Sequence, residues 1–233
     1  MIQQLYDVID ATWPAASKHQ IGPYTIRQGN GGGSRVSCAT GPADRHWLDK
    51  AEAAMHDLGQ VPIFMIRDGD SALDALLAER GYHIKDPVTI YSAPISAIDN
   101  GWSYSSDVYD IWPPIAVQRE IWENAGIGKA RLDIMTRAKC PNTTVMGRVG
   151  DVPAGTGFIG IDQNIAMIHA LEVAPNCRRQ GVATLIIRRM ALWAKQNGAD
   201  QISLVVTNAN SGANALYQTL GFDVVGHYHY RTQ

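Results

Sequence analysis

A short basic loop stands between a strand-like segment and a helical segment near the C-terminal end of the chain. The segment reads HALEVAPNCRRQGVATLII, and its turn brings together Arg178, Arg179, Gln180, Gly181 and the small Ala183. A helix N-terminus presents unpaired N–H groups and a partial positive charge, which favour a bound phosphate. Glycine lets the backbone approach an anion, and arginine adds charge-assisted hydrogen bonds. The loop therefore suits a pyrophosphate, and a capped turn with solvated charge is an equally good interpretation of the loop alone.

Two side chains just before this loop are candidates for moving protons, His169 and Glu172. Imidazole titrates near neutral pH, and burial can raise the pKa of a carboxyl group into the same range. Because side chains alternate along a strand, the two are predicted to lie on opposite faces unless the strand carries a bulge. A hydrogen-bonded core histidine, a solvated strand-end glutamate and a base that acts through water are the competing interpretations.

Hydrophobic periodicity places this loop in a repeating order of strands and helices. The second half predicts strands at 165–173, 201–207 and 223–230, with helices between them that stop at Gly198 and Gly221. The first half predicts strands at 35–40, 61–67 and 87–93, with helices at 49–59 and 72–82. When Gly81 is aligned with Gly221, ALDALLAERGY falls on GANALYQTLGF without a gap. A duplicated unit is the favoured explanation, and chance similarity of two ordinary units is the alternative.

The remaining segments are predicted from the glycine, proline and polar residues that mark turns and the ends of helices and strands. The polar and aromatic stretch 96–114 reads as a linker, 115–126 and 129–139 read as helices, and 143–173 reads as a strand meander that turns at GDVPAG and DQN. In GNGGGSRVS the residues after Gly33 read as a strand, so a flexible hairpin turn is predicted rather than a phosphate site. The alternate histidines of HYHY are predicted to pack in a strand.

Composition excludes several classes of protein. The chain has 233 residues, 45% of them hydrophobic and 18% charged, with a formal charge of −2. This balance predicts a globular core and gives no sign of nucleic-acid or membrane binding. No apolar run approaches the roughly 20 residues that span a bilayer. The three cysteines are scattered and lack metal-ligand spacing, which predicts reduced thiols in the cytoplasm and no metal site.

Two segments taken together resemble the hallmark motifs of the GNAT superfamily of N-acetyltransferases. LEVAPNCRRQGVATLII matches the family's Arg/Gln-x-x-Gly-x-Gly/Ala loop at Arg178, Gly181 and Ala183. ISLVVTNANSGANALYQTLGF matches the family's second segment at Asn210, Ala213, Leu216, Tyr217, Gly221 and Phe222. The resemblance covers the chain from about residue 104 to the end, and the first half only through the repeat.

The resemblance implies a role for each of these positions. The backbone N–H groups of the loop would bind the pyrophosphate of acetyl-CoA, and the strand end from Leu171 to Val173 would bind its pantetheine arm. Tyr217 would give a proton to the departing thiolate, and Asn210 would help to hold the cofactor. The predicted cofactor-binding residues are Leu171, Val173, Arg178, Arg179, Gln180, Gly181, Val182, Ala183, Thr184 and Asn210. The predicted catalytic residues are Tyr217, Glu172 and His169.

The expected fold is α/β, with two tandem GNAT-like units of mixed, mostly antiparallel sheet flanked by helices. Residues 1–98 would form a degenerate unit without the cofactor motif, since GPADRHW stands where the loop would be and Leu77 where Tyr217 would be. Residues 99–233 would transfer an acetyl group from acetyl-CoA to a primary amine, most simply of a small molecule, in a monomer or homodimer. A protein N-acetyltransferase and a non-catalytic acyl-CoA-binding protein are the alternatives.

Overall fold

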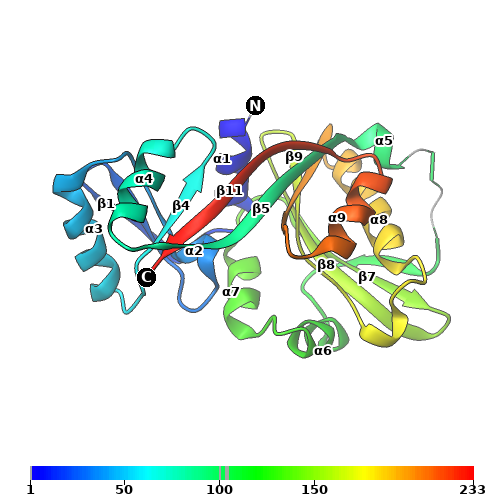
Figure 1. Ribbon diagram of the computed structural model, residues 1–233. Helices are drawn as coiled ribbons and strands as arrows, with labels where there is room; N and C mark the ends of the chain where they lie inside the picture. Colours follow the sequence, from blue (N-terminus) through cyan, green and yellow to red (C-terminus); the bar gives the residue numbers. More distant parts are fainter. Residues whose placement is uncertain (1, 100, 103–104) are drawn as a thin grey trace.

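One twisted sheet runs the length of the molecule in the computed structural model, which describes residues 2–99, 101–102 and 105–233 (Figure 1). In these residues its 11 strands are β1 (Ser17–Ile21), β2 (Tyr24–Gln28), β3 (Ala39–Thr40), β4 (Ile63–Arg67), β5 (His83–Pro94), β6 (Val108–Ile111), β7 (Asn142–Val149), β8 (Val152–Asp162), β9 (Ile165–Val173), β10 (Gln201–Thr207) and β11 (Asp223–Thr232). The helices are α1 (Ile2–Thr12), α2 (Ser34–Ser37), α3 (Arg45–Asp57), α4 (Ser71–Glu79), α5 (Ile95–Asp99), α6 (Ala116–Asn124), α7 (Lys129–Arg137), α8 (Val182–Gln196) and α9 (Ser211–Thr219), with a 3₁₀ turn at Pro175–Cys177.

The two halves of the chain exchange strands at the centre of this sheet. The strand order is β1-β2-β3-β4-β11-β5-β10-β9-β8-β7-β6, so β11 lies against β4 of the first half, and β5 lies against β10 of the second. Both contacts and the central β5–β11 pair are antiparallel. Figure 1 shows β5 and β11 crossing together between the two helical groups. Each half therefore completes the sheet of the other.

The repeat that the sequence predicts is present in the structure. Adding 140 to the residue numbers of α4 gives those of α9, and β5 and β11 begin at the same offset. Gly81 and Gly221 both have a positive φ, of 84° and 90°. A left-handed residue just after a helix favours glycine because a Cβ is disfavoured there. The two halves thus share one strand, helix and strand unit, and the mixed sheet flanked by helices confirms the expected fold class.

The first half differs from prediction around its glycine-rich segment. Residues 34–37 form the short helix α2, and only Ala39 and Thr40 of the predicted strand 35–40 are extended. The predicted hairpin turn is therefore wrong, because β2 and β3 are joined through a helix. The reason is tertiary: a Cβ on Gly32 would lie 2.6 Å from the Cδ1 atom of Ile134, so the glycines let this segment pack closely against α7. A local pattern does not contain that contact.

The segment 96–114 contains more structure than the predicted linker. It includes most of α5 and all of β6, which pairs with β7, while residues 100 and 103–104 lie outside the described residues. The meander that follows is confirmed, with turns between β7 and β8 and between β8 and β9. The helices predicted at 115–126 and 129–139 are confirmed as α6 and α7.

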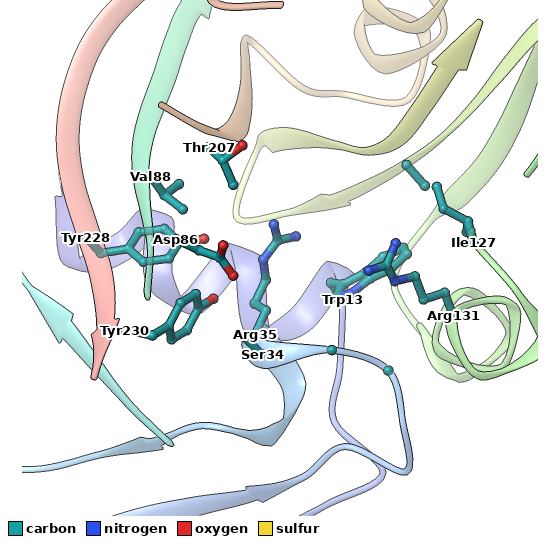
Figure 2. Close-up of a pocket in the computed structure, with 13 residues that line it drawn as sticks. Trp13, Ser34, Arg35, Asp86, Val88, Ile127, Arg131, Thr207, Tyr228 and Tyr230 are labelled. Atoms are coloured by element: carbon teal, nitrogen blue, oxygen red, sulfur yellow. The ribbon is translucent and has the colours of Figure 1, made fainter. Parts of the chain in front are cut away.

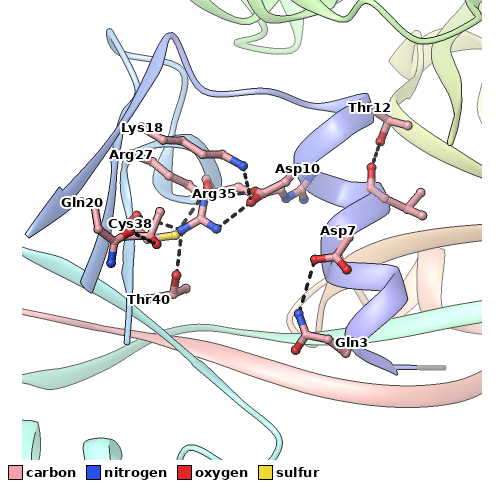
Figure 3. A network of polar contacts seen from close by, with 12 residues as sticks. Gln3, Asp7, Asp10, Thr12, Lys18, Gln20, Arg27, Arg35, Cys38 and Thr40 are labelled. Carbon is pink, nitrogen blue, oxygen red and sulfur yellow. Dashed lines mark hydrogen bonds and ion pairs between the residues drawn. The ribbon is translucent and has the colours of Figure 1, made fainter. Parts of the chain in front are cut away.

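Helix α1 was not predicted, although its apolar residues Leu5, Val8 and Ile9 recur at helical spacing and are all buried. Asp10 joins this helix to the sheet (Figure 3). Its carboxylate accepts hydrogen bonds from Arg27 Nε at 3.0 Å and Arg27 Nη2 at 2.7 Å, and from Lys18 Nζ at 2.9 Å. Burial alone would raise the pKa of Asp10, but the two cations hold it below its ordinary value. The C-terminal end of α1 is thereby tied to β1 and β2, and the helix also packs against β8 and β9.

Candidate active site

Strands β9 and β10 separate part-way along their length and leave a cleft between them. They pair in parallel only from Ile165 to Ile168 on β9 and from Gln201 to Leu204 on β10. Beyond this point both strands line a cavity of about 370 Å³, here called the β9–β10 cleft. The β10-facing edge of β9 after Ile168 therefore offers backbone groups that can pair with an extended ligand. Leu171 lies on this edge and lines the cleft, and the Val173 carbonyl accepts a hydrogen bond from Arg178 Nε at 3.2 Å.

A bulge in β9 decides which side chains enter the cleft. Thr156 of β8 pairs with Glu172, but Phe158, two residues on, pairs with His169, so β9 carries one extra residue. Ala170 has a φ of 49° at this point, and its carbonyl accepts a hydrogen bond at 2.7 Å from the indole of the fully buried Trp122. The bulge brings His169 and Glu172 together along the same cleft, although simple alternation would have separated them.

Glu172 and Tyr217 line the same cleft from different elements. Burial raises the pKa of the Glu172 carboxyl group, and Arg178 and Arg131 oppose this rise. Burial, with a smaller contribution from Glu172, raises the pKa of Tyr217 to about 12. At neutral pH the phenol is therefore protonated and can donate, whereas the carboxyl group is a base with increased proton affinity. The cleft thus combines a proton acceptor and a proton donor.

His169 also borders the cleft, but both of its ring nitrogens are engaged. Its Nδ1 atom lies 3.2 Å from Arg35 Nη1, and its Nε2 atom lies 2.8 Å from Thr12 Oγ1. Guanidinium groups only donate, so Nδ1 is the acceptor and the proton belongs on Nε2. Burial, reinforced by the charge of Arg35, lowers the pKa of His169 well below its ordinary value. The His169 ring is therefore neutral and fixed between Arg35 and Thr12, and it has no free nitrogen with which to act as a base.

The basic loop ends at the N-terminus of α8, as the sequence predicts. Gly181 occupies the N-cap position with a φ of 80°, and within the described part of the chain no side chain caps this helix. A Cβ at Gly181 would meet no atom within 4 Å, so the space above the helix is open. Arg178, Arg179 and Gln180 are exposed beside it. An anion can therefore reach the first N–H groups of the helix, which include those of Val182, Ala183 and Thr184.

Asn210 borders the cleft and begins α9. Its Oδ1 atom accepts a hydrogen bond from the Ala213 N–H at 3.1 Å, which makes it the N-cap of that helix. This carbonyl is therefore used within the protein, and the side-chain N–H₂ group is the part that can bind a ligand. The structure thus groups Asn210 with Leu171, Glu172 and Tyr217 around the cleft.

A second cavity, of about 250 Å³, continues from the β9–β10 cleft toward the first half of the chain (Figure 2). It is called the inter-unit pocket here, because its wall includes Trp13 just after α1, the glycine-rich segment, β5, β11 and residues of the second half. Arg35, Arg131 and Thr207 line both cavities. Sequence reasoning missed Trp13, Arg35, Asp86 and Arg131 as site residues. A glycine run before an arginine is a weak local signal, and the packing of the two halves is what brings these residues together.

The tryptophans at the start of the second half do not line this pocket in the structure. Trp122 is buried in the core, Trp112 is 42% exposed and Trp102 packs against the core of the second half. Trp13, which follows α1, lines the pocket, and its ring stacks on His169 with centroids 4.8 Å apart. Asp110 of β6 forms an ion pair with Arg189 and does not line either cavity.

Neither a metal cluster nor a membrane span is found in the described residues. No group of three or more His, Cys, Asp or Glu side chains there could hold a metal ion, and His229 pairs with Asp74 at 2.8 Å. No helix among these residues is both long and apolar enough to cross a bilayer.

Comparison with known proteins agrees with this geometry. The model of the acetyltransferase (GNAT) family matches residues 105–222. The chain belongs to this family. It is an acetyl-transferring enzyme, and the matched residues include both of the motifs on which the resemblance was based. The GNAT enzyme described here is 25% identical over 242 residues to the N-acetyltransferase YobR of Bacillus subtilis, an alignment that covers 99% of this chain and 98% of the relative.

Other similar proteins cover less of the sequence or share the fold alone. The streptothricin acetyltransferase of Streptomyces lavendulae is 37% identical over 83 residues, which is 35% of this chain and 43% of that protein. Among solved structures, a GCN5-related N-acetyltransferase from Kribbella flavida has a TM-score of 0.74 at 16% identity, covering 99% of this chain and 94% of its own. A tandem GNAT protein from the clavulanic acid biosynthesis pathway has a TM-score of 0.64 at 12% identity, covering 84% and 74%.

Proposed function

We propose that this GNAT enzyme transfers an acetyl group from acetyl-CoA to a primary amine of a small molecule by direct attack. One observation carries the proposal: Glu172 and Tyr217 face a single cleft between two separating strands, and an uncapped helix begins beyond one end of β9. The open N-terminus of α8 suits a pyrophosphate, and the unpaired edge of β9 suits an extended pantetheine chain. These are the two contacts that acetyl-CoA requires in order to place a thioester in the cleft.

Each residue then has a defined role in the reaction. Acetyl-CoA supplies the activated acyl group. Glu172 takes a proton from the ammonium group of the acceptor, directly or through water, so that the free amine can form the new N–C bond. Backbone N–H groups near Leu171 stabilise the charge that develops on the carbonyl oxygen. Tyr217 gives its proton to the thiolate as the C–S bond breaks, and the second proton that the nitrogen loses on becoming an amide returns to the Tyr217 phenolate, directly or through water. His169 holds the bulged strand to α1.

The catalytic unit in this proposal is 99–233, and the unit 1–98 binds no acyl-CoA. The helix that follows β3 supports this division. Asp44 caps α3, and its carboxylate accepts hydrogen bonds from the N–H groups of His46 at 3.0 Å and Trp47 at 3.2 Å. A carboxylate in this place fills the anion position and repels a phosphate. Leu77, which corresponds to Tyr217 by the 140-residue offset, is buried in the first core.

A small acceptor is favoured by the size and position of the inter-unit pocket. Its volume of about 250 Å³ is bounded by both halves of the chain, which suits a metabolite better than a protein surface. The enzyme is further proposed to act in the cytoplasm as a monomer or homodimer. The three cysteines are free thiols in the structure, as that compartment would keep them.

The experiment that tests this function has a binding part and a catalytic part. Acetyl-CoA at about 100 times its dissociation constant should stabilise the protein by roughly 2.7 kcal/mol, and ATP should not. Tyr217→Phe should lower kcat by about 100-fold or more with little change in thermal midpoint, because the ring keeps its contacts with Tyr91 and Phe222.

Tyr91→Phe is the matched control. Its hydroxyl group bonds to Asn214 Oδ1 at 3.0 Å, and Tyr91 does not line the cleft. Turnover should change by less than about threefold in this control, as expected for a hydroxyl with no part in proton transfer. Equal turnover in Tyr217→Phe and the parent enzyme would remove Tyr217 from the mechanism. The absence of any thermal shift at saturating acetyl-CoA would reject the proposed function.

A further inference from the structure

We propose that the acceptor amine carries a carboxylate, which binds between Arg35 and Arg131 in the inter-unit pocket while its amine is directed toward Glu172. The inference rests on the proposed function and names the substrate class of that same site. The acceptor would be an amino acid or a similar zwitterion rather than a polycation. Both arginines line the pocket and the adjoining β9–β10 cleft, and Glu172 lines that cleft. One small molecule can therefore contact the arginines with its carboxylate and Glu172 with its amine.

Arg35 is a cation held without a carboxylate partner. Its guanidinium interacts with the neutral His169 through Nη1 and with the hydroxyl groups of Tyr228 and Tyr230, whereas its Nε atom is buried with no hydrogen-bond partner. Within residues 2–99, 101–102 and 105–233, no acidic group forms an ion pair with it. Burying a guanidinium donor without an acceptor is costly unless an anion completes the site. In Figure 2 the side chain rises from α2 into the pocket.

Arg131 supplies the second half of the anion site from α7. Its Nη2 atom would lie 3.7 Å from a Cβ at Gly33, so the guanidinium lies close to the segment that carries Arg35. No ion pair involves Arg131 in the described part of the chain. Figure 2 shows that it reaches the pocket from the α7 side. Two guanidinium groups from separate elements suit a planar carboxylate, which accepts paired N–H donors.

The distribution of acids along the two cavities gives the acceptor a direction. Glu172 lies in the β9–β10 cleft, where acetyl transfer is proposed, whereas Asp86 is an exposed acid of the inter-unit pocket wall. An ammonium group is attracted toward Glu172. A carboxylate is attracted toward the inter-unit pocket, where the two positive charges of Arg35 and Arg131 exceed the one negative charge of Asp86. An aminoglycoside would instead place several positive charges against two guanidinium groups. The apolar part of a small acceptor can rest on Trp13, which also lines the pocket.

The test uses matched amines that differ only in charge. L-Leucine, L-phenylalanine and 4-aminobutyrate are compared with their carboxamides and with kanamycin, and acetyl-CoA consumption and the acetylated products are measured. The carboxylates should have kcat/KM values at least about tenfold above those of their amides. Arg131→Gln should lower kcat/KM by roughly 10- to 100-fold for carboxylates, mainly through KM, and by less than about threefold for amides.

Comparing paired substrates separates binding from chemistry. Arg131 also lowers the pKa of Glu172, and this effect of the substitution applies equally to both members of a pair. Lys129→Gln is the matched control, because it removes a positive charge from the start of the same helix. Lys129 is exposed, pairs with Asp133 at 2.7 Å and does not line the pocket. This control should leave the preference for carboxylates unchanged.

Binding is measured independently of turnover with phenylacetate and phenylacetamide, by saturation-transfer NMR in the presence of CoA. Phenylacetate should bind the parent enzyme and lose its signal in Arg131→Gln. The inference is overturned if amides or kanamycin are preferred, if Arg131→Gln affects both members of a pair equally, or if no carboxylate is acetylated and phenylacetate does not bind. Acetylation of uncharged amines alone would reject this inference and leave the proposed function intact. A protein that neither binds nor consumes acetyl-CoA would reject the proposed function itself.

Discussion

Lowering the pH should destabilise the enzyme through one buried histidine, and replacing that histidine should remove the effect. His169 is 3% exposed and lies between Arg35 and Thr12. A proton can be added only at Nδ1, where it would face the guanidinium of Arg35. Burial and this charge lower the pKa of His169 well below its ordinary value, so the folded protein keeps the ring neutral. His169→Gln and His169→Asn each keep an amide that can donate and accept but cannot be protonated in this range.

The size of the effect follows from the difference in bound protons between the folded and unfolded states. In the unfolded chain a histidine has a pKa of about 6.5. Below this pH the unfolded state binds a proton that the folded state does not, so stability falls as the pH falls. The stabilisation is complete above about pH 6.5 and is lost toward the lower pKa of the folded state, by at most about 1.4 kcal/mol per pH unit. Between pH 7.5 and 5.0 the His169 contribution is therefore about 2 kcal/mol at most.

Urea unfolding at half-unit intervals of pH measures this contribution. The parent should lose stability below about pH 6.5 more steeply than either His169 variant, and the difference between them isolates this one ring because all other titrating groups are shared. Both variants should also retain acetyl transfer, although β9 would be less firmly attached to α1. Retained activity would show that His169 positions the strand and is not the general base. Parallel stability profiles in parent and variants would refute the reasoning, as would a loss of kcat in both variants equal to that of Glu172→Gln.

Two further substitutions test the packing that shapes the site. Trp122→Phe should lower the free energy of unfolding by about 2 to 4 kcal/mol, measured by urea denaturation, because it leaves the Ala170 carbonyl without its donor and opens a cavity. A loss below about 1 kcal/mol would show that the indole does not hold the bulge. Gly32→Ala should cost about 1 to 3 kcal/mol, because its Cβ would lie 2.6 Å from the buried Ile134 Cδ1, 2.8 Å from Val36 Cγ2 and 3.0 Å from the backbone oxygen of Gly29. Gly212→Ala on α9, which would meet no atom within 4 Å, should be neutral or stabilising by thermal melt, and equal losses in both alanine variants would contradict the packing argument.

Much of the second half could be predicted from local rules. The helix after Gly181, the stop at Gly221 and the meander ending at β9 depend on caps, positive φ and alternation over a few residues. The first half was harder to predict, because its structure depends more on tertiary packing than on local patterns. Its α1 was overlooked despite a helical pattern, and its α2 read as a strand because Val36 is buried by tertiary packing rather than by the pairing of a strand.

In the candidate site, too, the features set by neighbouring residues could be predicted and those set by contacts between distant segments could not. The loop from Arg178 to Gly181 could be found from sequence because a strand, a basic turn and a glycine at a helix start are neighbours in the chain. The relation of His169 to Glu172 could not, because a bulge exists only with respect to the partner strand β8. Alternation alone predicted opposite faces, and the hydrogen bond from Trp122 to Ala170 helps to hold the strand in its bulged form.

The sequence by itself determined the family, the repeated unit and the basic loop that is proposed to bind an anion, because each is set by residue types at short, fixed separations. Only the tertiary structure decided that β5 and β11 exchange between the halves, and that Arg35 and Arg131 meet across one pocket. The residues brought together in these two ways are roughly 100 to 150 positions apart in the chain. The energies of these contacts depend on register and close approach in the assembled sheet, and no local pattern of residue types records either of them.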